Sequence, residues 1–315
     1  MMSIGGYFEL ELRTGNEYHA AAIRLNSGRN ALEYILSAKN YRKIYLPFYT
    51  CEAVLEPVLK LNVSYEFYHI DEKFEALFPV DHLEEGEVFL YTNYFGLKDE
   101  YIYHLNSKCP HLIIDNAQAF YSKPLKGIDT FYSPRKFFGV PDGGYLYTDM
   151  PSETNFERAI SFKRFEHLIR RIDVSAEDGY PVFSQNESSL KDLPILAMST
   201  LTSKLLCNID YDFIALKRRS NYIYLEERLR ESNRLTLQLN VHEVPLTYPF
   251  YSRDPGLRQR LIENRIYSPI YWENVEKWSG EQSLESDYAR NIYHLPVDQR
   301  WGEKELDHIL NVIAK

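Results

Sequence analysis

Residues 111–148, HLIIDNAQAFYSKPLKGIDTFYSPRKFFGVPDGGYLYT, decide the fold. The stretch opens with a short apolar run that ends in Asp115, and a second short run at 130–132 leads into Lys136. The turn Asp142-Gly143-Gly144 then precedes a third apolar run. Short buried strands of this kind are typical of a parallel sheet, and ligands of open α/β sheets bind where such strands end. The stretch therefore predicts a sheet edge that carries a carboxylate and a lysine.

Outward from this stretch, short apolar runs alternate with segments of helical period, which indicates a parallel sheet with crossover helices. We predict strands at 43–46, 64–68, 88–93, 111–115, 130–132, 145–148, 241–247 and 266–271. We predict helices at 27–38, 52–61, 99–107, 153–171, 195–207, 211–231, 255–264 and 303–313, and a long loop at 174–194. The predicted fold is α/β, with a large domain over 1–210 whose mostly parallel sheet is flanked by helices. A smaller α+β domain follows over 211–315.

Composition narrows the class of protein. The 315 residues are 44% hydrophobic and 26% charged, which is typical of a globular chain. The 36 basic and 45 acidic side chains give a net charge of −9, so we expect no nucleic-acid partner. Three widely spaced cysteines predict neither a disulfide framework nor a cysteine zinc site, and we expect no metal. We also expect no signal peptide and no membrane span, hence a cytoplasmic protein.

A strand-end carboxylate, a lysine and a helix N-terminus together match the requirements of pyridoxal 5′-phosphate. Lys136 could form the Schiff base with the aldehyde of this cofactor, and Asp115 could keep the pyridine nitrogen protonated. The phosphate needs backbone N–H groups and a helix dipole, which Ser27-Gly28-Arg29-Asn30 could provide at the start of a helix.

The chain resembles the DegT/DnrJ/EryC1/StrS family of fold-type-I, pyridoxal-phosphate-dependent sugar aminotransferases. The most specific part of the resemblance is the ordered series Asp115, Gln118, Lys136 and Asp142-Gly143-Gly144. The other matching segments are 27–32, 46–50, 114–119, 132–136, 218–222 and 295–300, so the resemblance covers most of the chain.

The resemblance implies a role for each residue of the site. Lys136 would bind the cofactor and move a proton, Asp115 would contact the pyridine nitrogen, and Gln118 would contact the ring hydroxyl. The groups implied to hold the phosphate are Gly28, Arg29 and Ser133. The implied reaction transfers an amino group from a small-molecule donor, glutamate, to a keto sugar linked to a nucleotide. A homodimer with active sites at the subunit interface is implied as well.

The chain departs from the family at three positions. Arg29 stands where the family has threonine, and it could pair with phosphate bidentately. Phe131 stands where the family often has serine, and Ser133 could take the role of that serine. Cys51 stands where an aromatic side chain usually covers the cofactor ring, so Tyr49 or Tyr94 could stack there instead.

Two other functions remain open at this stage. One is a different pyridoxal-phosphate reaction on the same fold, such as dehydration or elimination. The other is a dimeric homologue without catalytic activity, which Cys51 and Phe131 mildly favour. The basic cluster Lys163–Arg171 also has two interpretations, either a grip on an anionic substrate or a solvated helix face.

Overall fold

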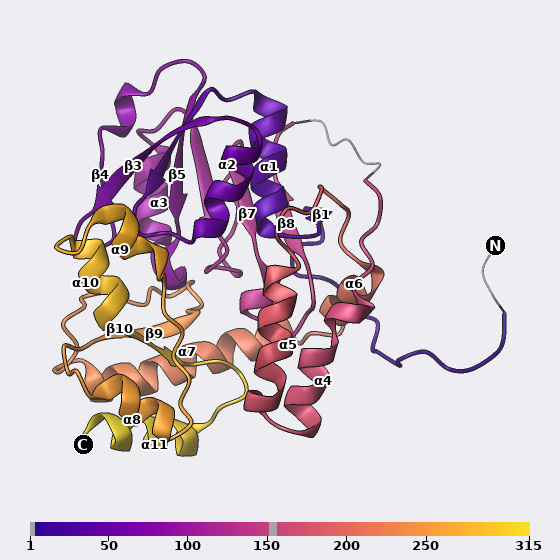
Figure 1. Ribbon diagram of the computed structural model, residues 1–315, viewed down its shortest axis with the longest axis vertical. Coiled ribbons are helices and arrows are strands. Elements are labelled where there is room, and N and C mark those ends of the chain that lie inside the picture. Colours follow the sequence, from indigo (N-terminus) through magenta and orange to yellow (C-terminus); the bar gives the residue numbers. More distant parts are fainter. Residues whose placement is uncertain (1–3, 151–155) are drawn as a thin grey trace.

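The computed structural model describes residues 4–150 and 156–315, and its framework is an eight-stranded sheet (Figure 1). The strand order is β1-β8-β7-β6-β5-β2-β3-β4. The strands are β1 Ile23–Leu25, β2 Lys43–Pro47, β3 Ser64–Ile70, β4 Ala76–Leu77, β5 Glu87–Thr92, β6 Leu112–Asn116, β7 Asp129–Tyr132 and β8 Gly144–Tyr147. β3, β2, β5, β6 and β7 pair in parallel, whereas β8 is antiparallel to both of its neighbours. The predicted α/β class with a mostly parallel sheet is confirmed.

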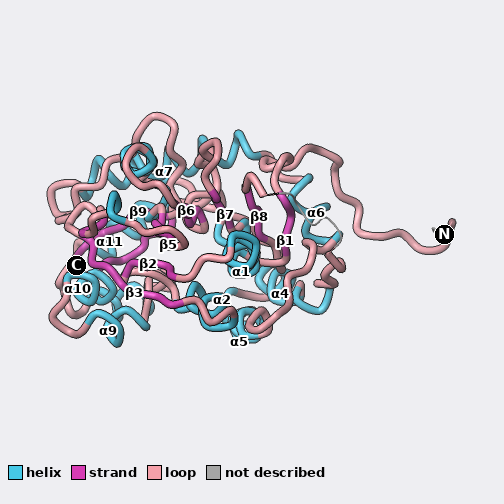
Figure 2. The backbone as a smooth tube through the Cα atoms, turned by 90° about the horizontal axis from the view of Figure 1, so that it is seen from above, coloured by secondary structure: helices cyan, strands magenta, loops and turns pink. Residues whose placement is uncertain are grey.

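Helices cover both faces of the sheet because side chains of successive strand residues point to opposite faces. Ile44 and Val88 pack with helices α1 (Gly28–Lys39) and α2 (Leu55–Lys60). Their neighbours in sequence, such as Tyr45 and Phe89, belong to a second core with α3 (Asp99–Asn106) and α7 (Tyr211–Leu229). Figure 2 shows α1 and α2 on one side of the strands and α7 on the other.

The C-terminal part adds a two-stranded antiparallel sheet of β9 (Thr247–Tyr251) and β10 (Ile292–Pro296). The remaining helices are α4 Glu166–Asp173, α5 Ala176–Ser188, α6 Thr200–Cys207, α8 Leu257–Glu263, α9 Asn274–Ser279, α10 Leu284–Asn291 and α11 Glu303–Ile313. The 3-10 turns are η1 Glu52–Val54, η2 Val80–His82, η3 Tyr94–Gly96, η4 Pro134–Lys136 and η5 Phe162–Arg164. One hydrophobic core runs from the sheet into this part and joins Tyr91 with Tyr222 and Trp272. The division into two domains at residue 210 stays a prediction.

The predicted loop at 174–194 is wrong, because most of it forms helix α5. Ser175 begins the helix: its hydroxyl accepts a hydrogen bond from the Asp178 N–H, and acidic residues fill the first turn. Pro181 removes one N–H from the helix, and this cap with its acidic turn offsets part of the loss. Gly179 packs against the His167 carbonyl of α4, so a small residue suits this helix pair.

Three further predictions need correction. The strands predicted at 241–247 and 266–271 are wrong: β9 begins only at Thr247, and 266–271 is irregular. Strand β10 was not predicted, because its five residues continue directly from helix α10 without a turn signal. The helix predicted at 153–171 lies partly outside the described residues, and α4 begins at Glu166.

The described residues contain no helix that is long and apolar enough to span a membrane. At the N-terminus, residues 4–16 form no helix or strand; Glu9 pairs with Lys204 of α6 and the Arg13 N–H donates to Asn208, and the chain before Glu9 extends away from the body of the molecule (Figure 1).

Candidate active site

Six strands of the large sheet point the same way, and the segments that follow five of them carry the predicted site residues at one edge. β1 leads into Ser27, β2 into Tyr49 and β5 into Tyr94, whereas Asp115 lies at the end of β6. β7 leads into η4, which carries Lys136. The sheet therefore brings together residues that are more than 100 positions apart in sequence, at the edge where α/β proteins bind ligands.

Asp115 is a carboxylate in a dry environment. Its side chain is buried, and its Oδ1 accepts a hydrogen bond of 2.8 Å from the Ala117 N–H. Burial raises the pKa of Asp115 to about 6, although the Ala117 N–H and the positive charge of Lys136 act in the opposite direction. A carboxylate in this position would be stabilised by a further cationic group beside it.

Lys136 lies in turn η4, and hydrogen bonds from the C-terminal part of the chain fix the backbone directly after it. Its Nζ lies 5.3 Å from the ring centre of Tyr271 and 6.0 Å from that of Trp272. The next carbonyl, that of Phe137, accepts hydrogen bonds from Arg218 Nη2 at 3.3 Å and from Gln299 Nε2 at 3.1 Å. The lysine therefore projects from a backbone with a defined position toward two aromatic rings.

Several buried polar atoms near these residues have no hydrogen-bond partner within the described chain, and they include Gln118 Nε2 and Tyr49 Oη. Gln118 Oε1 accepts a hydrogen bond of 2.9 Å from the Phe95 N–H, which fixes the amide and leaves its NH₂ free. An unpaired buried polar group costs about 1–3 kcal/mol, so such groups call for a physical explanation. A bound ligand that accepts from Gln118 would supply one.

The N-terminus of helix α1 offers N–H groups to an anion. The Ser27 hydroxyl accepts from the Asn30 N–H at 3.2 Å, and the N–H groups of Gly28 and Arg29 come before the first helical hydrogen bonds. The Arg29 guanidinium donates to Glu56 at 2.6 Å, so its side chain is engaged elsewhere in this structure. The main chain, rather than this side chain, is therefore free to bind phosphate.

The Asp142-Gly143-Gly144 turn positions this helix start. A Cβ on Gly144 would lie 2.4 Å from the Ser27 carbonyl carbon, so only glycine allows the two backbones to approach so closely. Asp142 is fully buried, and it accepts hydrogen bonds from the hydroxyls of Ser199 and Thr202. This part of the motif is therefore structural: it fixes where Ser27 begins the helix.

The sequence did not point to Tyr271, Trp272 or His294, which the fold brings to the same site. The Tyr49 ring centre lies 5.3 Å from that of Trp272, and the His294 ring centre lies 4.3 Å from that of Tyr271. Burial, Arg258 and Lys136 together lower the pKa of His294 to about 3, so this imidazole is neutral. No local motif marks these residues; the aromatic run at 267–272 was the only available signal.

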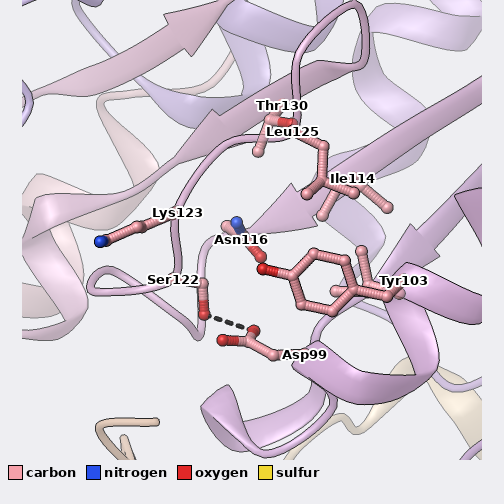
Figure 3. A pocket seen from close by; sticks show the side chains of 9 residues that line it. Asp99, Tyr103, Ile114, Asn116, Ser122, Lys123, Leu125 and Thr130 are labelled. Carbon is pink, nitrogen blue, oxygen red and sulfur yellow. Dashed lines mark hydrogen bonds between the residues drawn. The ribbon is translucent and has the colours of Figure 1, made fainter. Parts of the chain in front are cut away.

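A cavity of about 1100 Å³ opens beside Cys51 and Trp272, between α5, α8 and α9. Its wall includes the cationic side chains Arg171, Arg258 and Lys277, together with several aromatic rings. Arg171 belongs to the basic cluster noted in the sequence. A second hollow, of only about 10 Å³, lies where Ser122 donates to Asp99 at 2.7 Å (Figure 3). It has room for a water molecule but not for a substrate.

Within residues 4–150 and 156–315, no cluster of three or more histidine, cysteine, aspartate or glutamate side chains could hold a metal ion. The polar groups that the fold gathers at the sheet edge are therefore a carboxylate, an amide, a lysine and main-chain N–H groups.

No protein-family model matches the sequence, and a search of curated proteins found no match. Solved structures do match. The sugar aminotransferase CalS13 from Micromonospora echinospora is 15% identical, with a TM-score of 0.63 over 93% of this chain and 87% of that one. A DegT DnrJ EryC1 StrS aminotransferase from Brucella abortus is 15% identical, with a TM-score of 0.61 over 93% and 85%.

The sugar aminotransferase Spr1654 from Streptococcus pneumoniae, in its PLP-form, is 14% identical, with a TM-score of 0.65 over 92% of this chain and 86% of that one. These likenesses extend over nearly the whole of each chain, at an identity too low to carry function. The chain therefore has the architecture of pyridoxal-phosphate-dependent transferases of fold type I, as found in sugar aminotransferases of the DegT/DnrJ/EryC1/StrS type.

Proposed function

We propose that this chain is a pyridoxal-phosphate-dependent aminotransferase that transfers an amino group from glutamate to a keto sugar carried on a nucleotide. One observation carries the proposal: Asp115, Gln118 and Lys136 meet at the carboxyl edge of the sheet, and Gln118 keeps an unused buried donor. Structural neighbours that share this fold include sugar aminotransferases, and one of them was solved in a PLP-form and a PMP-form.

The residues at the edge fit this cofactor. Asp115 would hold the pyridinium nitrogen, because a buried carboxylate with a raised pKa is stabilised by a neighbouring cation. The free NH₂ of Gln118 would donate to the ring oxygen. The N–H groups of Gly28 and Arg29 and the Ser133 hydroxyl would hold the phosphate, with the α1 dipole behind them. Tyr49 would stack on the ring.

When bound, pyridoxal phosphate supplies an aldehyde that takes up the donor's amino group and a ring that stabilises negative charge on the neighbouring carbon. Lys136 would hold this aldehyde at rest and then, as a free amine, carry a proton between the reacting carbons. Tyr271 and Trp272 beside its Nζ would limit the movement of the amine and exclude water. Asp115 would stay ionised and keep the ring nitrogen charged.

The cavity supports an acceptor larger than an amino acid. Its volume of about 1100 Å³ lies just above the range of ordinary small-molecule sites, which is about 300–1000 Å³. Arg171, Arg258 and Lys277 on its wall suit the phosphates of a nucleotide-linked sugar, and the aromatic rings suit its base. We include a homodimer in the proposal.

The test is the absorption spectrum of the purified full chain after addition of pyridoxal phosphate. We expect a visible band that borohydride abolishes and that Lys136→Ala lacks, whereas Lys126→Ala, an exposed lysine nearby, should keep it. Glutamate should bleach the band as the amino group moves to the cofactor.

The other outcomes identify the alternatives. If no band forms in either protein, the chain is a binding protein on an aminotransferase fold. If the band forms but no amino donor bleaches it, and sugar products gain no nitrogen, the reaction is a dehydration or elimination.

A further inference from the structure

His294 of strand β10 is a buried imidazole whose hydrogen-bonding groups are both unused. Its exposed fraction is 1%, and Nδ1 and Nε2 are buried with no hydrogen-bond partner among the described residues. An unpaired buried polar group lowers stability, because it has given up its hydrogen bonds to water. Two such atoms on one side chain therefore point to a bound group that supplies a partner.

The imidazole lies next to the neighbours of two residues of the candidate site. The His294 ring centre is 4.3 Å from that of Tyr271, and the Tyr271 ring centre is 5.3 Å from Lys136 Nζ. The His294 ring centre is also 5.1 Å from that of Phe95, whose N–H donates to Gln118 Oε1 at 2.9 Å. One residue thus separates the imidazole from Lys136, and one residue separates it from Gln118.

Strand β10 directs His294 away from the large cavity. Tyr293, the preceding residue, lines that cavity, and successive side chains of a strand point to opposite sides. The His294 N–H donates to Ser268 Oγ at 2.7 Å, and the residue is paired with Pro249 of β9, so its backbone is fixed. A ligand of the imidazole is therefore expected at the sheet edge that suits the cofactor, and not in the cavity that suits the acceptor.

The charge state of the imidazole decides what it can do there. Burial lowers the pKa of His294 to about 3, and the positive charges of Arg258 and Lys136 act in the same direction. A group with this pKa takes up no proton near neutral pH, so it is a poor general base. The neutral ring offers one N–H donor and one acceptor nitrogen, and hydrogen bonding is its available chemistry.

One group of pyridoxal phosphate would lie close to both Lys136 and Gln118. It is the ring oxygen, which is attached to the carbon next to the one that bears the aldehyde. Lys136 would bind that aldehyde, and Gln118 would donate to that oxygen. The oxygen carries negative charge, and a buried anion is stabilised by more than one donor. Gln118 supplies one donor, and a second donor is needed from the residues around it.

We propose that the side-chain N–H of His294 donates a second hydrogen bond to the ring oxygen of pyridoxal phosphate, beside that of Gln118. This inference rests on the proposed function, because it needs the bound cofactor. His294 is then a cofactor-binding residue of the C-terminal part, whereas Asp115, Gln118 and Lys136 belong to the sheet and the turns that follow it. Both parts of the chain therefore contact the same atom of the cofactor.

Titration of the full chain with pyridoxal phosphate tests the proposal through the visible band. His294→Phe keeps an aromatic ring beside Tyr271 and Phe95 but removes both nitrogens, and the dissociation constant of the cofactor should rise about ten-fold. The pH at which the band is half lost should rise by about one unit. The reason is that an oxygen with fewer donors holds more tightly the proton that it shares with the Lys136 nitrogen. Gln118→Leu should move this midpoint in the same direction, and His294→Gln, which keeps an N–H donor, should restore at least half of the shift.

His167→Phe is the matched control. His167 is also buried and its Nδ1 has no partner in the described chain, but it belongs to helix α4, so neither the dissociation constant nor the midpoint should change. Without cofactor, His294→Phe should be at least as stable to urea as the unaltered chain, because it removes two unpaired buried atoms. Loss of the fold in this variant would show that the imidazole is structural, and it would overturn the proposal.

The remaining outcomes separate this inference from the proposed function. A midpoint that moves in Gln118→Leu but not in His294→Phe would overturn the role of His294 and leave the proposed function intact; the imidazole would then bind an internal water. An unaltered chain that forms no visible band would overturn the proposed function, and this inference with it.

Discussion

Two of the groups of buried polar side chains in the described part of the chain differ in how much of their hydrogen-bonding capacity is used. On helix α7, Arg218 donates to the carbonyls of Pro245, Leu246 and Phe137, and Asn221 Nδ2 lies within 3.2 Å of three backbone carbonyls. At the sheet edge, Tyr49 Oη and Gln118 Nε2 have no partner within the described residues.

This difference distinguishes side chains that hold the fold in one arrangement from side chains that could bind a ligand. A saturated buried network specifies one arrangement of the chain, and the α7 group does so by holding the carbonyl that follows Lys136. An unsaturated buried group lowers stability and is tolerated where a ligand completes it. Both groups belong to segments that resemble the same enzyme family, yet only the sheet edge has bonding capacity left for a substrate or cofactor.

The largest loss of stability should come from removing Arg218 from the buried hydrogen-bond network of α7. Arg218→Leu removes a donor from three buried carbonyls, of which only that of Phe137 keeps another, Gln299 Nε2, and we expect the free energy of unfolding to fall by about 4 kcal/mol. Urea denaturation measures it. Arg228→Leu on the same helix removes an exposed arginine, and it should change stability by less than about 1 kcal/mol. Equal losses in the two variants would show that the α7 network does not stabilise the fold.

Removing the charge of Asp115 should raise the free energy of unfolding, by less than Arg218→Leu lowers it. Its pKa of about 6 in the folded chain lies about two units above the usual 3.9, which corresponds to about 3 kcal/mol. Between pH 4 and pH 6 the unfolded chain gives up this proton while the folded chain keeps it, so the fold loses stability as pH rises through that window. Cofactor-free Asp115→Asn should therefore be about 3 kcal/mol more stable at pH 7.5, with no gain below pH 4.

Asp142→Asn is the matched control for Asp115→Asn. Asp142 is also fully buried, but hydroxyl donors satisfy its carboxylate, so its replacement should lower stability at pH 7.5. Asp115→Asn should weaken the binding of pyridoxal phosphate at the same time, measured by the visible band. A variant that is stabilised and still binds the cofactor fully would contradict the assignment of Asp115 to the ring nitrogen.

The smallest effect should appear in a pair of neighbouring tyrosines. Tyr49 and Tyr94 are both fully buried, but the Tyr94 hydroxyl donates to the Tyr49 carbonyl at 2.9 Å, whereas the Tyr49 hydroxyl has no partner in the described chain. Tyr94→Phe should lower the free energy of unfolding by about 1 kcal/mol, and Tyr49→Phe should raise it by about as much. Calorimetry on the cofactor-free protein distinguishes the signs, and a loss in both variants would contradict this difference.

The sequence predicted the fold class and the central strands because local pattern determines both. Asp115 ends an apolar run and Lys136 follows the next one, and the edge of a parallel sheet brings such positions together. Tyr271 and Trp272 could not be predicted, because only packing of the C-terminal part against the sheet places them beside Lys136. Helix α5 could not be predicted, because Gly179 and Pro181 have low helix propensity and the Ser175 cap is a weaker local signal.

The core that joins the sheet to the C-terminal helices has a consequence for synthesis of the chain. Its first buried residue is Tyr45 and its last is Val312, so members of one packed unit leave the ribosome far apart in time. At 5–20 residues per second the interval is roughly 10–50 s. Until α11 emerges, the part of this core that α7 and α8 share with α11 remains incomplete. This part of the core is therefore where we expect chaperones to bind the nascent chain.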